Sequence, residues 1–261
     1  MKYGFIGCGN MGGAIAKALS KATQDILISD PTPAAKEFAA SIGCQSADNV
    51  TVASNCDRIF LAVKPQMMAG VLASIADILK EKKPHLITIA AGIEMQAIEQ
   101  MIGIPLPIIR LMPNTPVAVE KGMIVYCKNN LVSDIVISDF LCDMRFCGIL
   151  DPIEEKLIDA ASALSGSGPA YIYMFLEAMA DGAVACGLPR KKAMEYAAAT
   201  MAGAAQMYLS TGKHPGDLKD AVCSPAGSTI VGVQQLETHG FRGAVMDCIT
   251  AAYRKNKELG K

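Results

Sequence analysis

The sequence predicts an α/β fold in two parts: a doubly wound parallel sheet over residues 1–150, followed by an all-helical domain over residues 151–261. In the first part, short apolar, β-rich runs alternate with segments of helical spacing, which is typical of a parallel sheet covered by helices on both faces. After Asp151-Pro152 this alternation stops, and long Ala-, Met- and Leu-rich stretches are separated only by Gly- and Pro-containing breaks.

The expected elements of the first part alternate in chain order. Strands are expected at Lys2–Ile6, Ile26–Ser29, Arg58–Ala62, Leu86–Ala90 and Pro107–Leu111. Helices are expected at Met11–Ala22, Pro33–Ile42 and Gln66–Lys80.

The second part contains helices marked by proline at the start and glycine at the end. Pro169 suits the first turn of a helix that stops at Gly187, and Pro189 suits the first turn of one that runs to about Tyr208. Six alanines between Ala197 and Ala205 leave this second helix apolar on nearly all sides, so it must be buried on more than one face. Because about 110 residues cannot easily enclose several such helices, we expect the helical parts of two chains to form a homodimer.

Composition excludes several classes of partner and site. The chain has 24 Lys and Arg against 25 Asp and Glu, which gives no electrostatic reason to expect binding to nucleic acid or to an anionic membrane. The three histidines lie in no metal-binding arrangement, and the nine cysteines contain no C-x-x-C pair. No basic-then-apolar leader follows Met1, and no uncharged run reaches the ~18 residues of a membrane span. We therefore expect a cytoplasmic protein with reduced thiols and a small-molecule substrate.

A G-x-G-x-x-G motif, Gly7 to Gly12, follows the first strand and opens the first helix, as in a Rossmann-type dinucleotide-binding domain. In such a motif Gly7 makes the tight turn, Gly9 lets the backbone approach a pyrophosphate, and Gly12 lets the helix pack closely on the strand. Asp30 ends the second strand, at the spacing at which a dinucleotide fold places the acid that binds the ribose. A carboxylate there favours NADH over NADPH, although Lys36 on the next helix could offset this preference. Alternatively, Asp30 only caps the next helix.

Four further loops are candidate binding elements. Ala62–Pro65 and Ala90–Gly92 follow strands, at the sheet edge where open α/β sheets bind ligands, although Lys64 could equally be a solvated surface lysine. Ser224–Thr229 places a Pro/Gly turn before a helical run, which suits a carboxylate or phosphate, or else an ordinary Ser/Thr N-cap. The small-residue turn Ser165–Pro169 presents the same two alternatives.

With these residues in view, the chain resembles the pyrroline-5-carboxylate reductases, which make L-proline from its cyclic imine. The resemblance spans essentially the whole chain. Its motifs are Phe5–Gly12, Ala62–Pro65, Arg110–Pro116, Leu164–Tyr171 and the segment from His214 through Thr229 to Leu259.

The resemblance implies an N-terminal Rossmann domain, a C-terminal dimerisation domain, dimers that often assemble into a ring, NADPH or NADH as cofactor, and no strict acid–base residue. The cofactor-binding residues that it implies are Ile6, Gly7, Cys8, Gly9, Asn10, Met11, Gly12, Asp30, Asn49, Ala62, Val63, Lys64, Pro65, Ala91 and Gly92. The substrate-binding residues that it implies are Ser224, Gly227, Ser228 and Thr229.

Two positions depart from the family pattern. The family usually has Ser-Pro-Gly-Gly-Thr-Thr where this chain has Ser-Pro-Ala-Gly-Ser-Thr, and often has a glutamate near the position of Ser210. Ala226 adds a methyl group and a backbone restriction that glycine lacks.

Two alternative functions are weighed against a reductase. A hydroxyacid dehydrogenase with the same two-domain plan needs a general base, a lysine in those enzymes, and the stretch from Leu157 to Pro189 contains no lysine. A non-catalytic dinucleotide-binding dimer would have no use for the turns at Ser165–Pro169 and Ser224–Thr229.

Overall fold

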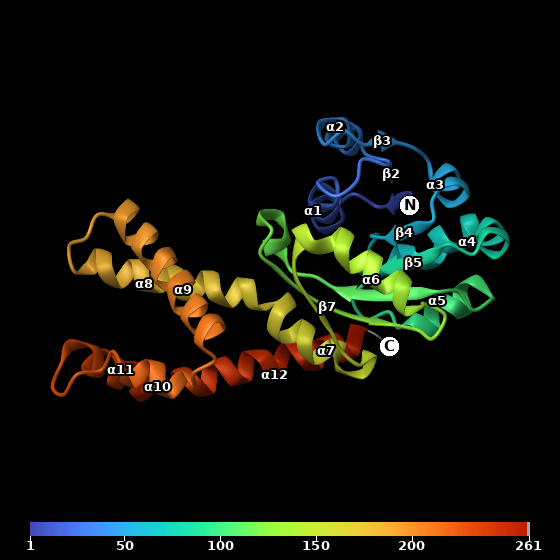
Figure 1. Ribbon diagram of the computed structural model, residues 1–261. Coiled ribbons are helices and arrows are strands. Elements are labelled where there is room, and N and C mark those ends of the chain that lie inside the picture. Colours follow the sequence, from blue (N-terminus) through green and yellow to red (C-terminus); the bar gives the residue numbers. More distant parts are fainter. Residues whose placement is uncertain (260–261) are drawn as a thin grey trace. The chain divides into compact units, whose positions relative to one another are not determined.

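The computed structural model describes residues 1–259, which pack as two compact units (Figure 1). Unit 1 contains Met1–Ser167 together with the end of the last helix from Ala252 on, and unit 2 contains Gly168–Ala251. A domain boundary at residue 150 stays a prediction from sequence pattern; the packing of the described residues changes after Ser167.

Unit 1 is built on one eight-stranded sheet with the order β3-β2-β1-β4-β5-β6-β7-β8. The strands are β1 (Tyr3–Ile6), β2 (Ile26–Ser29), β3 (Gln45–Ser46), β4 (Arg58–Leu61), β5 (His85–Thr88), β6 (Ile108–Met112), β7 (Gly122–Lys128) and β8 (Gly148–Pro152). Only the β6–β7 pair is antiparallel. The predicted fold class, a mostly parallel N-terminal sheet followed by a helical part, is confirmed.

The five predicted strands are present, but the sequence pattern missed β3, β7 and β8. β3 has two exposed residues, too few for a periodicity to show. The link from β6 to β7 is the short 3₁₀ turn η1 (Thr115–Val119) instead of a helix, so the strand–helix alternation that revealed the other strands does not extend to β7. β8 is mostly exposed and ends in proline.

Helices and short turns surround this sheet (Figure 1). The helices are α1 (Asn10–Leu19), α2 (Pro33–Ser41), α3 (Asn49–Asn55), α4 (Pro65–Lys82), α5 (Met95–Ile102), α6 (Asp134–Asp143) and α7 (Ile158–Ala161). The remaining turns are the 3₁₀ turns η2 (Met144–Cys147) and η3 (Glu155–Leu157) and the π-helical turn η4 (Ser162–Gly166).

The sheet separates two apolar cores, as its double winding requires. One core joins Phe5 and Phe60 of the strands to residues of α1, α2 and α6. The other joins Ile59 and Leu61 to residues of α3, α4 and α5. Phe5 and Phe60 stack with their ring centroids 4.3 Å apart. Both faces are therefore covered, and ligand-binding loops are expected at the carboxyl ends of the parallel strands.

A buried arginine ties β4 to α6. Arg58 is fully buried, and its Nη1 donates to Tyr3 Oη at 2.5 Å and to Asp143 Oδ2 at 3.2 Å, while Nη2 donates to the Val136 carbonyl at 3.1 Å. Tyr3 Oη in turn donates to Asp143 Oδ2 at 2.6 Å. Burial, together with the hydrogen bond to Asp143, raises the pKa of Tyr3 above its usual range, so the phenol stays protonated as a donor.

A second buried arginine ties β6 to the end of the last helix. Arg110, 2% exposed, pairs with Glu155 at 3.0 Å and with Asp159 at 3.9 Å. Asp159 also pairs with Lys257 at 3.1 Å, and its carbonyl accepts from Asn256 Nδ2 at 3.1 Å. Through these contacts the end of the last helix belongs to unit 1.

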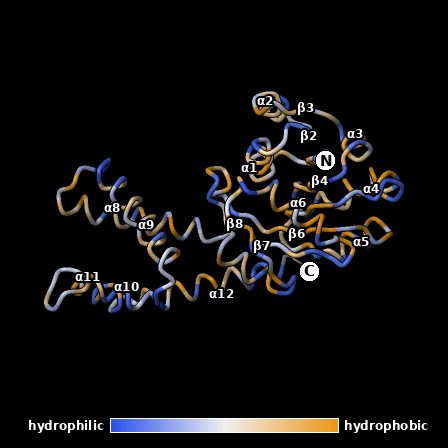
Figure 2. Tube along the Cα trace, viewed as in Figure 1, coloured by the Kyte–Doolittle hydropathy of each residue, from blue (hydrophilic) through white to orange (hydrophobic). Residues whose placement is uncertain are grey.

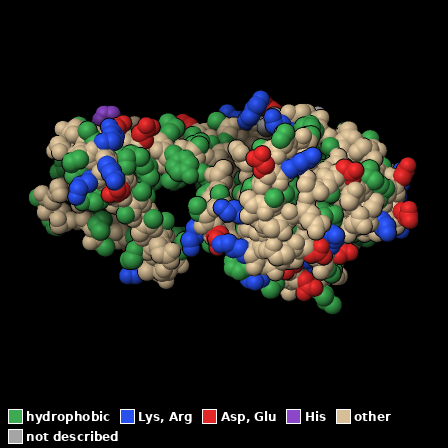
Figure 3. Space-filling model, turned by 90° about the horizontal axis from the view of Figure 1, so that it is seen from above, with side chains coloured by type: hydrophobic (Ala, Val, Ile, Leu, Met, Phe, Trp, Pro, Cys, Tyr) green, Lys and Arg blue, Asp and Glu red, His purple; other side chains and the backbone are tan. Residues whose placement is uncertain are grey.

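Unit 2 is entirely helical in its described residues, as predicted. Its helices are α8 (Gly168–Ala185), α9 (Arg190–Thr211), α10 (Pro215–Asp220), α11 (Ser228–Thr238) and the greater part of α12 (Phe241–Leu259). Apolar residues recur along α8 and α9 (Figure 2), yet Tyr173 is 61% exposed and Met174 is 71% exposed. Figure 3 likewise shows hydrophobic side chains at the molecular surface. One chain therefore leaves much of the apolar surface of this unit uncovered.

Among the residues described, none of the helices combines the length and the hydrophobicity that crossing a bilayer requires.

Candidate functional site

The glycines of the loop after β1 have the geometry that a dinucleotide motif needs. Gly7 adopts a φ of +98°, and a Cβ there would lie 2.6 Å from the carbonyl oxygen of Ala62. A Cβ on Gly12 would lie 2.8 Å from the Gly7 oxygen and 2.9 Å from the Ala62 Cβ. The tight turn at Gly7 and the close packing of α1 against the loop after β4 therefore both require glycine.

Gly9 differs from its two neighbours because a Cβ there would meet no atom within 4 Å. Gly9 is also the N-cap of α1, and no side chain caps the helix. The first N–H groups of α1 therefore have no side-chain cap, and such a helix N-terminus attracts an anion. This geometry fits a dinucleotide pyrophosphate.

The residues beside Gly9 have distinct surroundings. Cys8 and Asn10 line, with Gly9, a cavity of about 400 Å³ between α1 and α2; Cys8 and Met11 pack against the apolar core, and Met11 does not line the cavity. Burial, assisted by the nearby Asp30 carboxylate, raises the pKa of the Cys8 thiol to about 11. Cys8 is therefore neutral near pH 7 and adds no charge at the position that suits a phosphate.

Asp30, directly after β2, links the glycine loop to the turn before α2. Its Oδ2 accepts from the Cys8 N–H at 2.8 Å, and its Oδ1 accepts from the Thr32 N–H at 3.0 Å and the Thr32 hydroxyl at 2.7 Å. Burial works to raise the pKa of Asp30, but these hydrogen bonds outweigh it and hold the pKa below its usual range. The N-cap of α2 is Thr32, so Asp30 does not cap that helix.

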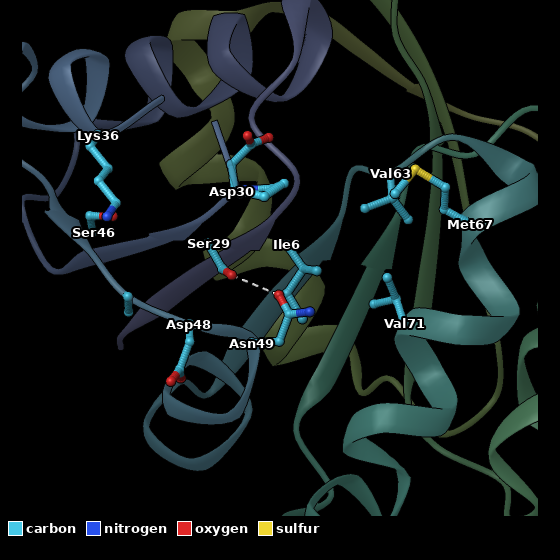
Figure 4. Close-up of a pocket in the computed structure, with 12 residues that line it drawn as sticks. Ile6, Ser29, Asp30, Lys36, Ser46, Asp48, Asn49, Val63, Met67 and Val71 are labelled. Atoms are coloured by element: carbon cyan, nitrogen blue, oxygen red, sulfur yellow. Dashed lines mark hydrogen bonds between the residues drawn. The ribbon is translucent and has the colours of Figure 1, made fainter. Parts of the chain in front are cut away.

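A larger cavity of about 670 Å³ opens beside Asp30 (Figure 4). Of the predicted cofactor-binding residues, Ile6, Asp30, Asn49 and Val63 line it. The sequence analysis missed Ser29, whose hydroxyl donates to Asn49 Oδ1 at 2.7 Å and thereby orients that amide. Its place as the last residue of β2, one before Asp30, was the available signal.

The other predicted cofactor-binding residues lie in loops that leave the same edge of the sheet. Strand pairing aligns Ile6 with Leu61 and Leu61 with Thr88, so the loops after β1, β4 and β5 emerge together. The loop after β4 provides Ala62, Val63, the exposed N-cap Lys64 and the first residue of α4, Pro65. The turn after β5 contains Ala91 and Gly92, which has a φ of +74°.

The predicted substrate-binding residues lie in unit 2, at the start of α11. The Gly227 N–H donates to the Ser224 carbonyl at 3.0 Å, which closes a turn with Pro225 and Ala226 at its centre. Gly227 is the N-cap of α11 without a side-chain cap, so an ordinary Ser/Thr N-cap is not observed. Ser228 and Thr229 are the first two residues of α11, and their side chains are exposed.

Ala226, the departure from the family pattern, adopts a φ of +58°. Positive φ at the third position of a turn with proline at the second is the geometry that favours glycine. The glycine usual in the family therefore has a conformational reason, and this chain holds alanine in the same left-handed conformation.

Comparisons with known proteins cover the whole chain. Residues 155–259 match the family model for pyrroline-5-carboxylate reductase dimerisation, and residues 2–92 match the model for NADP oxidoreductase, coenzyme F420-dependent. The pyrroline-5-carboxylate reductase of Escherichia coli K12 is 43% identical, with 100% of this chain and 98% of that protein covered. The Methanosarcina acetivorans protein of the same name is 40% identical over the same shares of the two chains. The chain belongs to the pyrroline-5-carboxylate reductase family.

Solved structures of pyrroline-5-carboxylate reductases have the same fold. The Plasmodium falciparum pyrroline carboxylate reductase with NADP bound gives a TM-score of 0.91 at 33% identity and covers 100% of this chain and 98% of its own. The Coxiella burnetii pyrroline-5-carboxylate reductase gives the same values. As a pyrroline-5-carboxylate reductase family member, the chain is an NAD(P)H-dependent oxidoreductase that self-associates through its helical part. This membership decides against the hydroxyacid dehydrogenase alternative.

Proposed function

We propose that the chain reduces 1-pyrroline-5-carboxylate to L-proline with NADPH or NADH, the last step of proline biosynthesis. Full-length family membership supports the reaction. The observation that carries the cofactor assignment is the open space in front of Gly9 at the uncapped start of α1.

The proposed cofactor-binding residues divide by the part of the dinucleotide they would hold. The N–H groups at the start of α1 would bind the pyrophosphate, as helix N-termini bind anions. Asp30 and Asn49, on the larger cavity, would contact the adenosine ribose. The loops Ala62–Pro65 and Ala91-Gly92 would hold the nicotinamide end, since they leave the same sheet edge farther along the strand order.

In this reaction the main task of the protein is to orient the imine relative to the cofactor. NADPH or NADH, when bound, supplies a hydride. The iminium carbon of the protonated substrate accepts it, the C=N π pair becomes the lone pair of the proline nitrogen, and the cofactor leaves as NAD(P)⁺. Because the iminium already carries its proton, no strict acid–base residue is needed, and the protein's task is to hold the imine at reacting distance and exclude water.

The proposed substrate-binding residues are Ser224, Gly227, Ser228 and Thr229. The N–H groups of Ser228 and Thr229 at the start of α11 and the exposed hydroxyls of this turn suit the substrate carboxylate, since a helix N-terminus without a side-chain cap favours an anion. We also propose that the dimers assemble into a ring and that the enzyme acts in the cytoplasm. Light scattering of the purified protein tests the assembly, and a dimer mass would refute the ring.

The first experiment measures oxidation of NADPH and of NADH by the purified protein with pyrroline-5-carboxylate, with L-proline identified as the product. Turnover with either cofactor is the expected result. Cofactor binding without turnover would support the non-catalytic alternative and refute the proposed reaction.

The pyrophosphate assignment is tested with Gly9→Ala, whose methyl group would point into open space and so should not disturb the fold. We expect the KM for the cofactor to rise about tenfold or more, because the methyl occupies the position where the backbone approaches the phosphate. Gly70→Ala in α4, which also meets no atom within 4 Å, is the matched control and should keep its KM. An unchanged cofactor KM in Gly9→Ala would refute the assignment.

The carboxylate assignment is tested with Ser228→Pro, which removes one N–H and the hydroxyl. Ser228 is the first residue of α11 and follows Gly227 at a ψ of 166°, a conformation compatible with a following proline. We expect a raised KM for the imine with unchanged cofactor binding. Arg190→Pro, at the first residue of α9 after an extended residue, is the control with the same backbone change in the same unit. An equal KM in both variants would contradict the assignment.

A further inference from the structure

Asn114 has a buried side chain whose two amide ends bind different segments of unit 1. It follows β6 and is 8% exposed. Its Oδ1 accepts from the Met123 N–H of β7 at 2.9 Å, and its Nδ2 donates to the Ser165 carbonyl of η4 at 3.0 Å. Since a backbone N–H can only donate and a carbonyl can only accept, these two partners fix the orientation of the amide.

The position of Asn114 places it at the ligand-binding edge of the sheet. The parallel pairing of β5 with β6 aligns Thr88 with Arg110, so Asn114, two residues after the end of β6, leaves the sheet at the same edge as the turn after β5. The proposed nicotinamide loops lie at this edge. The Asn114 carbonyl also accepts from the Val117 N–H at 3.2 Å at the start of η1, and Ala118 of η1 lines the same cavity as Gly9.

The partner of the Asn114 amide donor is a π-helical turn, an irregular element that is frequent at functional sites. In η4 the Ser167 N–H reaches back to the Ser162 carbonyl at 3.0 Å, and the Ser165 hydroxyl bonds the Ala161 carbonyl at 2.9 Å. A Cβ on Gly166 would lie only 3.1 Å from Ser162 Oγ, so the turn is closely packed. Because its Ser165 carbonyl is bonded to Asn114, the turn is held at the ligand-binding edge by a side chain from the segment between β6 and η1.

We propose that Asn114 is a positioning residue for the reduction: its amide sets the place of the η4 turn at the cofactor edge, and thereby the geometry at the nicotinamide end of the cofactor site. This inference rests on the proposed function. Asn114 contacts neither reactant in the proposal; it acts through the Ser165 carbonyl. A displacement of the turn by about 1 Å would reduce the rate of a reaction that depends on orientation by up to ~100-fold.

The test uses Asn114→Asp in the full-length protein. This change keeps the acceptor for the Met123 N–H and the backbone bond that starts η1, but it replaces the donor facing the Ser165 carbonyl with an oxygen. We expect kcat to fall about tenfold to a hundredfold, while the dissociation constant of NADPH, measured by fluorescence titration, changes less than about twofold because the contacts of the glycine loop remain.

The matched control is Asn129→Asp, at the opposite edge of the sheet. Asn129 Oδ1 also accepts a backbone N–H, from Ile108 at 3.1 Å, and its Nδ2 donates to the Leu106 carbonyl at 2.6 Å and to Glu99 at 3.0 Å. It loses hydrogen bonds of the same kind, two instead of one, far from the ligand edge. We expect a fall in melting temperature at least as large and an unchanged kcat.

Each outcome bears on the proposal. A loss of kcat in Asn114→Asp that the control does not share supports it, whereas equal kcat values in the two variants at matched stability refute it. If Asn114→Asp does not fold, Asn114→Ser, which keeps a small polar group in the same space, is measured instead and should show the same loss of kcat with cofactor binding retained. If the unsubstituted enzyme does not turn over the imine, the proposed function and the positioning role both fail; if it does, only the positioning role is in question.

Discussion

Replacing Ala226 with glycine is expected to stabilise the protein, although it removes a methyl group. The left-handed conformation at Ala226, with a φ of +58°, costs an L-residue about 1–2 kcal/mol, and glycine avoids this cost. The extra freedom of glycine in the unfolded chain offsets about 0.4–1 kcal/mol. The net effect on the free energy of unfolding is a gain of about 0.5–1 kcal/mol, equivalent to ~1–4 °C in melting temperature for a chain of this size.

The assay is thermal unfolding of both proteins at equal concentration, with Ala73→Gly as control. Ala73 is an exposed interior residue of α4, where glycine should cost about 0.5–1 kcal/mol. The two alanine-to-glycine changes should therefore shift the melting temperature in opposite directions. A lower melting temperature in Ala226→Gly would show that the strain assigned to this turn is absent. The Ser224–Gly227 hydrogen bond does not involve the methyl, so kcat/KM should stay within about twofold.

Three further predictions concern unit 1. Arg58→Met should lower the free energy of unfolding, measured in urea, by about 2–4 kcal/mol, because Asp143 and its neighbours lose a buried partner; a loss below about 0.5 kcal/mol would contradict this. The pKa of Asp30 is lower in the folded than in the unfolded chain, so its contribution to stability is present above about pH 4 and is lost as pH falls through the folded pKa. The melting temperature of the wild type should therefore fall more between pH 6 and pH 3 than that of Asp30→Asn. Lys36, which lines the same cavity as Asp30, should attract the 2′-phosphate of NADPH. Lys36→Ala should therefore lower kcat/KM for NADPH about tenfold and leave kcat/KM for NADH nearly unchanged. Equal losses for both cofactors would exclude a contact of Lys36 with the 2′-phosphate.

Local sequence patterns were sufficient for the parts of the fold that local interactions determine. The glycines at 7 and 12 were assigned correctly because their spacing reflects one tight turn and one helix start. The bounds of β2 were predicted correctly because a short apolar run ends at a polar residue. The helices α8 and α9 were found from the prolines and glycines at their ends.

Features that depend on distant partners could not be predicted in this way. β7 pairs antiparallel with β6 after a 3₁₀ turn, and no local periodicity encodes that pairing. The role of Asn114 depends on Met123 and Ser165, which approach it only in the folded chain. The pair of the buried Arg110 with the partly exposed Glu155 joins residues 45 positions apart. In the last two cases a polar side chain acquires its role from tertiary contacts that sequence spacing does not contain.

The return of α12 to unit 1 has a consequence for folding during synthesis. Unit 1 includes Asp159, but Asn256 and Lys257, which bind it, follow the whole of unit 2 in the chain. Chains fold as they emerge from the ribosome, starting from the N-terminal side. Unit 1 is therefore translated first, and its Asp159 carboxylate lacks the ion pair with Lys257 until every helix of unit 2 has been made. If a ribosome stalls within Gly168–Ala251, the nascent sheet domain lacks the contacts of Asp159 with Asn256 and Lys257.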